Sequence, residues 1–204
     1  MGMNPFVTVR QFEQAVAEYT GAPYAVSIDS CTGALFLACT YLRVKEVTIP
    51  ARTYVSVPCS IIHAGGKVVM EDKTWSGAYQ LEPYPIWDCA CRFTSGMYVP
   101  GTYQCLSFQY KKHLPIGRGG MILTDDAKAV EWFKLARFHG RHEVPLMEDT
   151  PAMVGWHLYM EPERASRGLT LLSSIAKDND DLYFDYPDIR TFNLYDNPER
   201  FYGL

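Results

Sequence analysis

Near the N-terminus, apolar residues recur at the spacing of one face of a helix. The positions concerned are Val9, Phe12, Ala15, Val16 and Tyr19. Thr8 precedes most of this run as a candidate N-cap, and Gly21 follows it in the position that glycine commonly takes just past a helix end. The pattern predicts a helix that starts at Thr8, ends before Gly21 and packs on the surface of the domain.

Short apolar runs then alternate with helical runs along the middle of the chain. Strands are predicted at 24–28, 46–49, 67–70, 85–88, 103–108 and 120–124, and helices at 33–42, 54–63 and 126–138. This alternation is typical of the α/β class, in which helices flank a mostly parallel sheet. Residues 72–85 break the rhythm and are predicted to be a loop. Residues from 178 onward, rich in Asp, Asn, Tyr and Pro, are predicted to form an irregular tail.

The composition narrows the class of protein. The chain has 204 residues, of which 48% are hydrophobic, and this is enough for a sizeable core. The net charge is −4 and no basic stripe is visible, so binding to nucleic acid is disfavoured. No apolar run has the length of a membrane span, and the first residues lack the features of a signal peptide. We therefore expect a cytoplasmic protein that does not associate with a membrane.

Six cysteines lie inside apolar runs, where an unpaired cysteine behaves as a small hydrophobic residue. We expect free thiols, as in a reducing compartment. The sequence has no C-x-x-C pair and no cysteine–histidine spacing of the kind that holds zinc, so no metal site is predicted.

The segment CLSFQYKKHLPIGRGG, residues 105–120, is the strongest candidate for chemistry. A predicted strand leads into two lysines and then a glycine-rich turn. An amine fixed between such elements can form an imine with an aldehyde. Four other segments accompany it in a fixed order along the chain: SCTGAL (30–35), IPARTY (49–54), WDCA (87–90) and LARFHG (135–140).

Together these five segments resemble the DegT/DnrJ/EryC1/StrS family of pyridoxal-phosphate-dependent sugar aminotransferases. The resemblance covers roughly residues 8–172 and implies the large domain of a fold-type I pyridoxal-phosphate enzyme. It implies a cofactor-binding α/β domain over residues 1–145 and a much reduced C-terminal segment and tail over 146–204. In the family's F-S-F-x-x-T-K register, Lys112 rather than Lys111 is the Schiff-base lysine.

The turn at residues 30–33 is a candidate phosphate site. It lies between a predicted strand and a predicted helix, where backbone N–H groups and the helix dipole favour an anion. An ordinary N-cap is the alternative interpretation of Ser30 and Thr32. The resemblance implies that this turn binds the phosphate of pyridoxal phosphate, that Thr32 donates a hydroxyl and that Ser107 makes a second contact. Cys31 stands where the family has glycine.

Three further positions are implied to lie at the cofactor ring. Asp88 matches the carboxylate that pairs with the pyridine nitrogen, although a strand-end aspartate can also simply cap the next loop. Tyr54 matches the aromatic residue that stacks on the ring. Cys91 stands where the family has a glutamine that touches the ring hydroxyl. Relatives that dehydrate sugars have histidine in place of Lys112, so the lysine favours transamination, with Lys112 also acting as general base.

Other features depart from the family. Arg118 replaces a glutamate, and the segment GWHLYM (155–160) resembles G-Y-N-x-R-M, with His157 at the asparagine. The resemblance implies a homodimer in which His157 reaches the partner's cofactor phosphate. The leading hypothesis is an aminotransferase that uses a nucleotide-linked keto-sugar and glutamate. A sugar dehydratase-like enzyme and a catalytically inactive scaffold protein with the same fold remain as alternatives.

Overall fold

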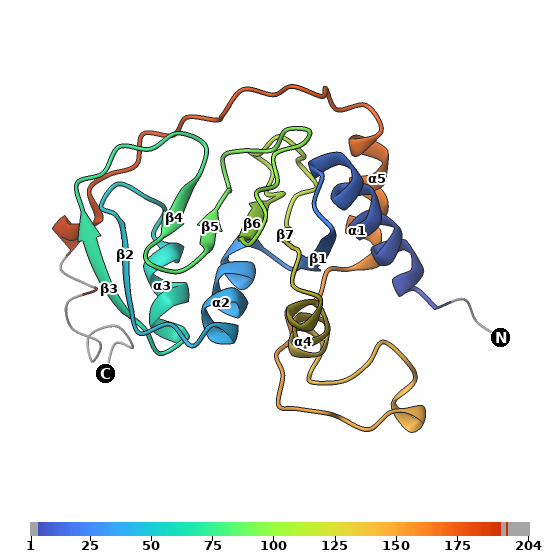
Figure 1. Ribbon diagram of the computed structural model, residues 1–204. Coiled ribbons are helices and arrows are strands. Elements are labelled where there is room, and N and C mark those ends of the chain that lie inside the picture. Colours follow the sequence, from blue (N-terminus) through green and yellow to red (C-terminus); the bar gives the residue numbers. More distant parts are fainter. Residues whose placement is uncertain (1–3, 193–194, 196–204) are drawn as a thin grey trace.

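The sheet and its flanking helices are seen in a computed structural model, which describes residues 4–192 and 195 (Figure 1). Five strands form one sheet in the order β1 (Tyr24–Ile28), β7 (Gly120–Thr124), β6 (Tyr103–Ser107), β5 (Ile86–Asp88) and β4 (Tyr79–Leu81). A second, two-stranded sheet contains β2 (Glu46–Pro50) and β3 (Lys67–Glu71). The helices are α1 (Phe6–Thr20), α2 (Cys31–Tyr41), α3 (Ser56–His63), α4 (Ala127–Arg137) and α5 (Pro162–Leu172).

The α/β class is confirmed, but the five-stranded sheet is mixed rather than mostly parallel. β5 and β6 pair in parallel, as do β2 and β3, whereas β1–β7, β6–β7 and β4–β5 are antiparallel. The reason lies in the connections. Residues 82–85 between β4 and β5 are too few for a helical crossover, and residues 108–119 between β6 and β7 form a loop that contains Lys112. Both connections therefore return the chain in the opposite direction.

Most of the predicted elements are present, with some corrections at their ends. α1 begins at Phe6, so Thr8 lies inside the helix and is not its cap, whereas Gly21 ends it in the left-handed conformation. α2 and α3 begin at residues 31 and 56 instead of 33 and 54. The loop predicted over 72–85 contains β4, and α5 was not predicted from the pattern. α5 packs on α1 where Gly168 leaves room for the ring of Phe12.

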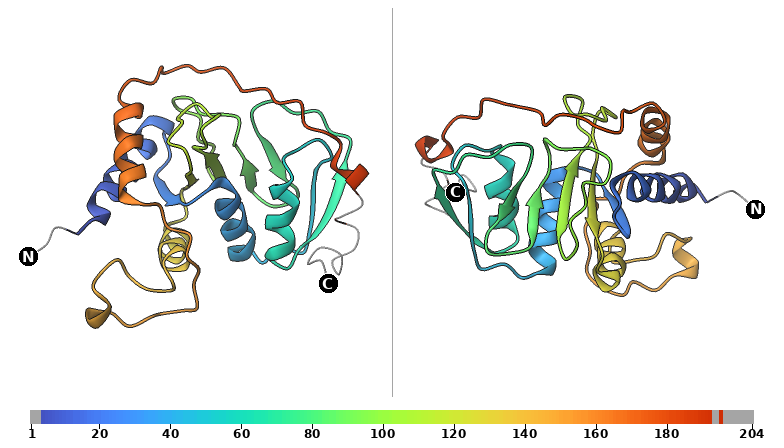
Figure 2. Two further views of the ribbon diagram at one scale, coloured as in Figure 1. Left: turned by 180° about the vertical axis from the view of Figure 1, so that it is seen from behind. Right: turned by 45° about the horizontal axis from the view of Figure 1, so that its top comes forward.

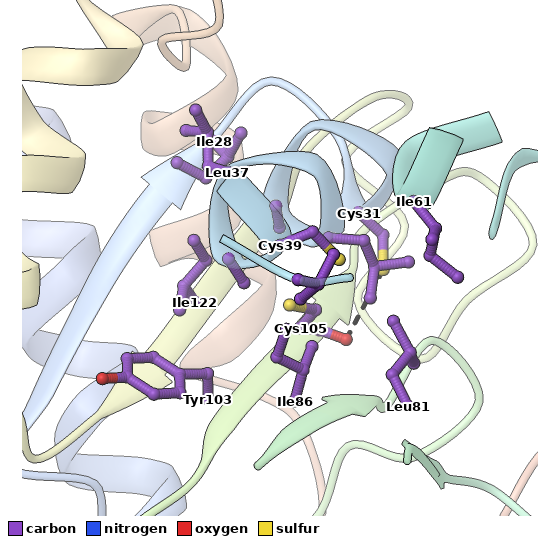
Figure 3. Packing of buried hydrophobic residues seen from close by; sticks show 14 of the residues in the cluster. Ile28, Cys31, Leu37, Cys39, Ile61, Leu81, Ile86, Tyr103, Cys105 and Ile122 are labelled. Carbon is purple, nitrogen blue, oxygen red and sulfur yellow. Dashed lines mark hydrogen bonds between the residues drawn. The ribbon is translucent and has the colours of Figure 1, made fainter. Parts of the chain in front are cut away.

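Helices flank both faces of the sheet (Figure 2), and an apolar core lies on each face. One core joins the strands to α2, α3 and α4, and the other joins them to α1 and α5. Alternate residues of one strand serve the two cores: Cys105 of β6 faces the first and Leu106 the second. Figure 3 shows the first core, in which Cys31, Cys39 and Cys105 lie among aliphatic side chains. All six cysteines are free thiols, as expected.

An ion pair is buried within the fold. Arg137, at the end of α4, donates to Glu13 of α1, to the backbone oxygen of Ser27 in β1 and to Glu143. The Arg137 side chain is 1% exposed and that of Glu13 is 6% exposed. The segment LARFHG therefore contains a residue that ties α4 to α1 and β1.

The chain beyond α5 crosses the sheet. Residues 176–189, which we call the strap, run over the ends of the strands toward η2 (Ile189–Phe192), next to the β2–β3 sheet (Figure 1). The strap is irregular, as predicted for residues from 178 onward. The predicted tail beyond η2 lies, apart from residue 195, outside the described residues. Within the described residues, no helix is long and apolar enough to cross a membrane.

Candidate functional site

A cavity of about 410 Å³ lies where β5 and β6 end, beside the start of α2. Carboxyl ends of strands are the usual location of ligand sites in α/β proteins. Every predicted site residue except His157 lines this cavity. These residues are Ser30, Cys31, Thr32, Tyr54, Asp88, Cys91, Ser107 and Lys112.

Lys112 is the partly buried member of the lysine pair, whereas Lys111 is exposed, although both line the cavity. The Lys112 Nζ donates a hydrogen bond to the Cys91 Sγ at 3.4 Å. Burial raises the pKa of both Asp88 and Cys91, and the positive charge of Lys112 opposes part of this rise. The amine of Lys112 is thus directed toward the carboxylate side of the cavity.

Asp88 ends β5 as a buried carboxylate, 6% exposed. Its Oδ1 accepts a hydrogen bond from the Ala90 N–H at 2.9 Å, and its Oδ2 accepts one from the Tyr79 hydroxyl at 3.1 Å. Burial nevertheless raises the pKa of Asp88, since desolvation outweighs these bonds and the charge of Lys112. A cationic partner in the cavity would stabilise the charged form of this carboxyl.

Hydroxyl groups gather where two helices begin. Ser30 caps α2 by accepting from the Gly33 N–H at 3.0 Å, so the N-cap interpretation is correct for Ser30, whereas Thr32 lies inside the helix. Thr32 donates to Ser56, the first residue of α3, at 2.8 Å. Because both helices point their N-termini toward the cavity wall, this end of the cavity suits an anion. Ser107, the last residue of β6, lines the same cavity.

Gly120 fixes the position of the turn at residue 30. A Cβ atom on Gly120 would lie 2.3 Å from the Ser30 carbonyl carbon and 2.6 Å from the Cys31 nitrogen, both backbone atoms. Only glycine therefore lets β7 approach the turn this closely. The Cys31 thiol points toward the sheet, 3.5 Å from the Cys105 backbone oxygen, and burial raises its pKa.

Aromatic side chains form one wall of the cavity, and only one of those described next was predicted from the sequence. Tyr54 was expected there, but Trp75, Phe184 and Tyr186 also line the cavity. The rings of Trp75 and Tyr186 are stacked at 6.0 Å with an interplanar angle of 19°, and the ring of Tyr54 is 6.2 Å from that of Tyr186. The signal that could have revealed the last two residues is the cluster of three aromatic residues in LYFDYP, 182–187.

His157 lies outside this cavity. Its Nδ1 is 3.0 Å from the His139 Nε2, and it lines a separate cavity of about 180 Å³ together with Arg118 and Arg164. Arg118 lines both cavities and is ion-paired with Asp29. A single chain places His157 away from its own Lys112, and its contact with a partner chain stays a prediction. Within the described residues, no group of three or more candidate ligands could hold a metal ion.

Comparison with protein families covers four of the five segments singled out in the sequence, all except WDCA at 87–90. The model of the DegT/DnrJ/EryC1/StrS aminotransferase family matches residues 4–83 and 97–181, which is well over half of the chain. The chain belongs to this family. The matched residues include the helix N-termini at one end of the cavity and the loop that holds Lys112.

Curated relatives in this family are similar over part of their length. The chain is 26% identical over 181 residues to the spore coat polysaccharide biosynthesis protein SpsC of Bacillus subtilis, covering 65% of this chain and 46% of that protein. It is 25% identical over 210 residues to the GDP-perosamine synthase of Caulobacter vibrioides, covering 81% and 56% respectively. The chain thus spans about half the length of the curated relatives it matches.

Solved structures share the fold of this DegT/DnrJ/EryC1/StrS chain. The sugar aminotransferase Spr1654 from Streptococcus pneumoniae, in its PLP form, has a TM-score of 0.66 at 18% identity, covering 86% of this chain and 60% of that one. AtS13 from Actinomadura melliaura has a TM-score of 0.68 at 23% identity, covering 82% and 60%. At these identities the structural likeness supports the fold.

Proposed function

We propose that this chain is the cofactor-binding part of a pyridoxal-phosphate-dependent aminotransferase that acts on a keto-sugar. The observation that carries the proposal is one shared cavity with three kinds of group. It has an amine, Lys112, a buried carboxylate, Asp88, and hydroxyls at two helix N-termini. Pyridoxal phosphate has an aldehyde, a basic ring nitrogen and a phosphate, which are complementary to these groups. The residues present fit this cofactor.

Each residue has a role that follows from its chemistry. Lys112 would hold the cofactor covalently through Nζ, and Asp88 would pair with the ring nitrogen, where a cation relieves the cost of a buried carboxylate. The backbone of the turn at 30–32 and the Thr32 and Ser107 hydroxyls would bind the phosphate. Tyr54 would stack on the ring, and Cys91 would lie beside it. When bound, the cofactor supplies an electron sink for a substrate carbanion.

Lys112 can also serve as the proton carrier of the site. Its Nζ is close enough to the Cys91 thiol to donate a hydrogen bond, and Asp88 lies within reach of its charge. An amine held in this way can take up a proton and return it as a general acid and base. The aromatic residues on the other wall would limit the entry of water.

The names of relatives support a nucleotide-linked keto-sugar as substrate. Similar proteins include the GDP-perosamine synthase above and a UDP-4-amino-4,6-dideoxy-N-acetyl-beta-L-altrosamine transaminase of Campylobacter jejuni, 22% identical over 214 residues. Glutamate is the proposed amino donor, and a homodimer the proposed working unit. The lysine at position 112 supports transamination over the dehydratase-like alternative.

A titration with pyridoxal phosphate tests the proposal. We expect visible absorption to rise with cofactor and saturate, and borohydride reduction to leave the pyridoxyl label on Lys112 in peptide maps. Lys111→Ala is the matched control and should retain the label, whereas Lys112→Ala should lose it. Label on Lys111 alone would overturn the assignment. No label on any lysine would support the scaffold interpretation.

A further inference from the structure

The strap is fixed to the body of the domain at several points. The Asn179 amide donates to the backbone oxygen of Phe93 at 3.1 Å, and the Leu182 N–H donates to the Cys91 oxygen at 2.9 Å. Arg92 forms an ion pair with Asp181 at 2.6 Å. These contacts hold the strap against the segment that follows β5 and carries Cys91.

A second attachment lies on the other side of the cavity. The Ile189 N–H donates to the Ala51 oxygen at 3.0 Å, and the Ile189 side chain is fully buried. Arg52 and Asp188 form an isolated antiparallel bridge. The segment between Leu182 and Asp188 is therefore attached to the domain at both of its ends and passes along the cavity.

The solvent exposure of the side chains alternates from residue 182 to residue 188. Residues 183, 185 and 187 are exposed, whereas residues 182, 184, 186 and 188 are partly buried. The Tyr186 N–H donates to the Phe184 backbone oxygen at 3.0 Å, which closes a three-residue turn around Asp185. Phe184 and Tyr186 both line the cavity, while Tyr183 is 84% exposed.

The two inward rings contact the groups that carry the proposed chemistry. The Lys112 Nζ lies over the ring of Phe184, 4.2 Å from its centroid, a cation–π arrangement. The Tyr186 hydroxyl is 4.0 Å from the Cys91 Sγ, and burial raises the pKa of Tyr186. The two rings are 5.8 Å apart, so they form one continuous aromatic surface opposite Lys112 and Cys91.

We propose that Phe184 and Tyr186 are binding-site residues, supplied by the same chain, that hold a planar ligand ring against Lys112. The inference rests on the proposed function, because the ligand class is the pyridine ring of the cofactor. The aromatic surface provides contact area and orientation for a flat ring. It also shields the Lys112 amine when no ligand is bound.

Cofactor titration by absorption is the first test. Phe184→Ala and Tyr186→Ala should each raise the dissociation constant for pyridoxal phosphate by roughly tenfold, the factor expected for loss of one aromatic contact. Tyr183→Ala, on the outward side of the same segment, should bind as the wild type does. Phe184→Tyr, which keeps an aromatic ring, should bind pyridoxal phosphate with wild-type affinity, whereas Phe184→Leu should bind it more weakly. Wild-type affinity in Phe184→Ala, Tyr186→Ala and Phe184→Leu would overturn the proposal.

A second test needs no cofactor and separates this inference from the proposed function. Trace acetylation with acetic anhydride, followed by mass spectrometry, gives the labelling of Lys112 relative to Lys111 in the same molecule. Phe184→Ala should increase this ratio about threefold, because the ring no longer covers the amine, and Tyr183→Ala should leave it unchanged. An unchanged ratio in Phe184→Ala would refute the shielding. If Phe184→Ala increases the labelling of Lys112 but the wild type fails to bind pyridoxal phosphate, the proposed function is rejected. The contact between Phe184 and Lys112 then stands without it.

Discussion

Removal of the buried guanidinium should be among the most destabilising single changes in this chain. Arg137→Met keeps much of the length of the side chain but leaves Glu13 as a buried carboxylate without its cation. Glu13 would keep only the Ser27 N–H and hydroxyl, each at 2.9 Å. Breaking a buried ion pair by removing one partner typically costs about 3–5 kcal/mol. For a chain of this length, that corresponds to a melting temperature lower by about 10 °C.

Chemical denaturation and thermal melting measure the loss, and a double-mutant cycle tests its cause. Glu13→Gln together with Arg137→Met removes both charges, so the double variant should be more stable than Arg137→Met alone. Lys134→Met, on the same helix, is the control for the loss of a surface cation and should change stability by less than about 0.5 kcal/mol. The reasoning is refuted if the changes in free energy of unfolding for Glu13→Gln and Arg137→Met add up in the double variant. It is also refuted if Arg137→Met destabilises the protein no more than Lys134→Met does.

Three further predictions concern the site. Burial raises the pKa of Asp88, so this group makes the cofactor-free chain less stable as pH rises above the ordinary value of 3.8. Asp88→Asn should remove this pH dependence of the melting temperature. It should also slow half-transamination by glutamate, and an unchanged rate would refute the role of Asp88 at the ring nitrogen. Gly120→Ala should cost about 1–3 kcal/mol and weaken cofactor binding, because the new methyl displaces the Ser30 backbone; a variant with wild-type stability and affinity would contradict this. Mixed Lys112→Ala and His157→Ala chains should regain activity if a dimer shares its sites, and an active, cofactor-loaded monomer in light scattering would exclude sharing.

Elements whose ends are set by neighbouring residues could be predicted from the sequence. The strand that ends at Asp88, the turn that starts at Ser30 and the loop that carries Lys112 each follow from a short run of residues, and all three line one cavity. The spacing also correctly places Gly21 at the end of α1. Local turn and capping chemistry sets the ends of these elements, whereas the distant Gly120 sets how closely the turn at Ser30 packs on β7.

Features set by distant contacts were not predicted. The inward orientation of Phe184 and Tyr186 depends on attachments to Cys91 and Ala51, which no local pattern reveals. The direction of β7 depends on the length of its connection and on its partners. The burial of Arg137 depends on Glu13, far away in the sequence, and a lone arginine on a helix is ordinarily assigned to the surface.

The close approach of Gly120 to Ser30 has a consequence for the order of folding. β1 is at the edge of its sheet and, within the part of the chain that the structure describes, pairs with β7 alone, which is made much later during synthesis. The turn that caps α2 packs against β7 through Gly120, so this contact closes a long loop of chain. Contacts between distant segments form late because the entropy of loop closure opposes them. A nascent chain that stops before residue 120 therefore has β1 and the start of α2 without the strand that packs against both.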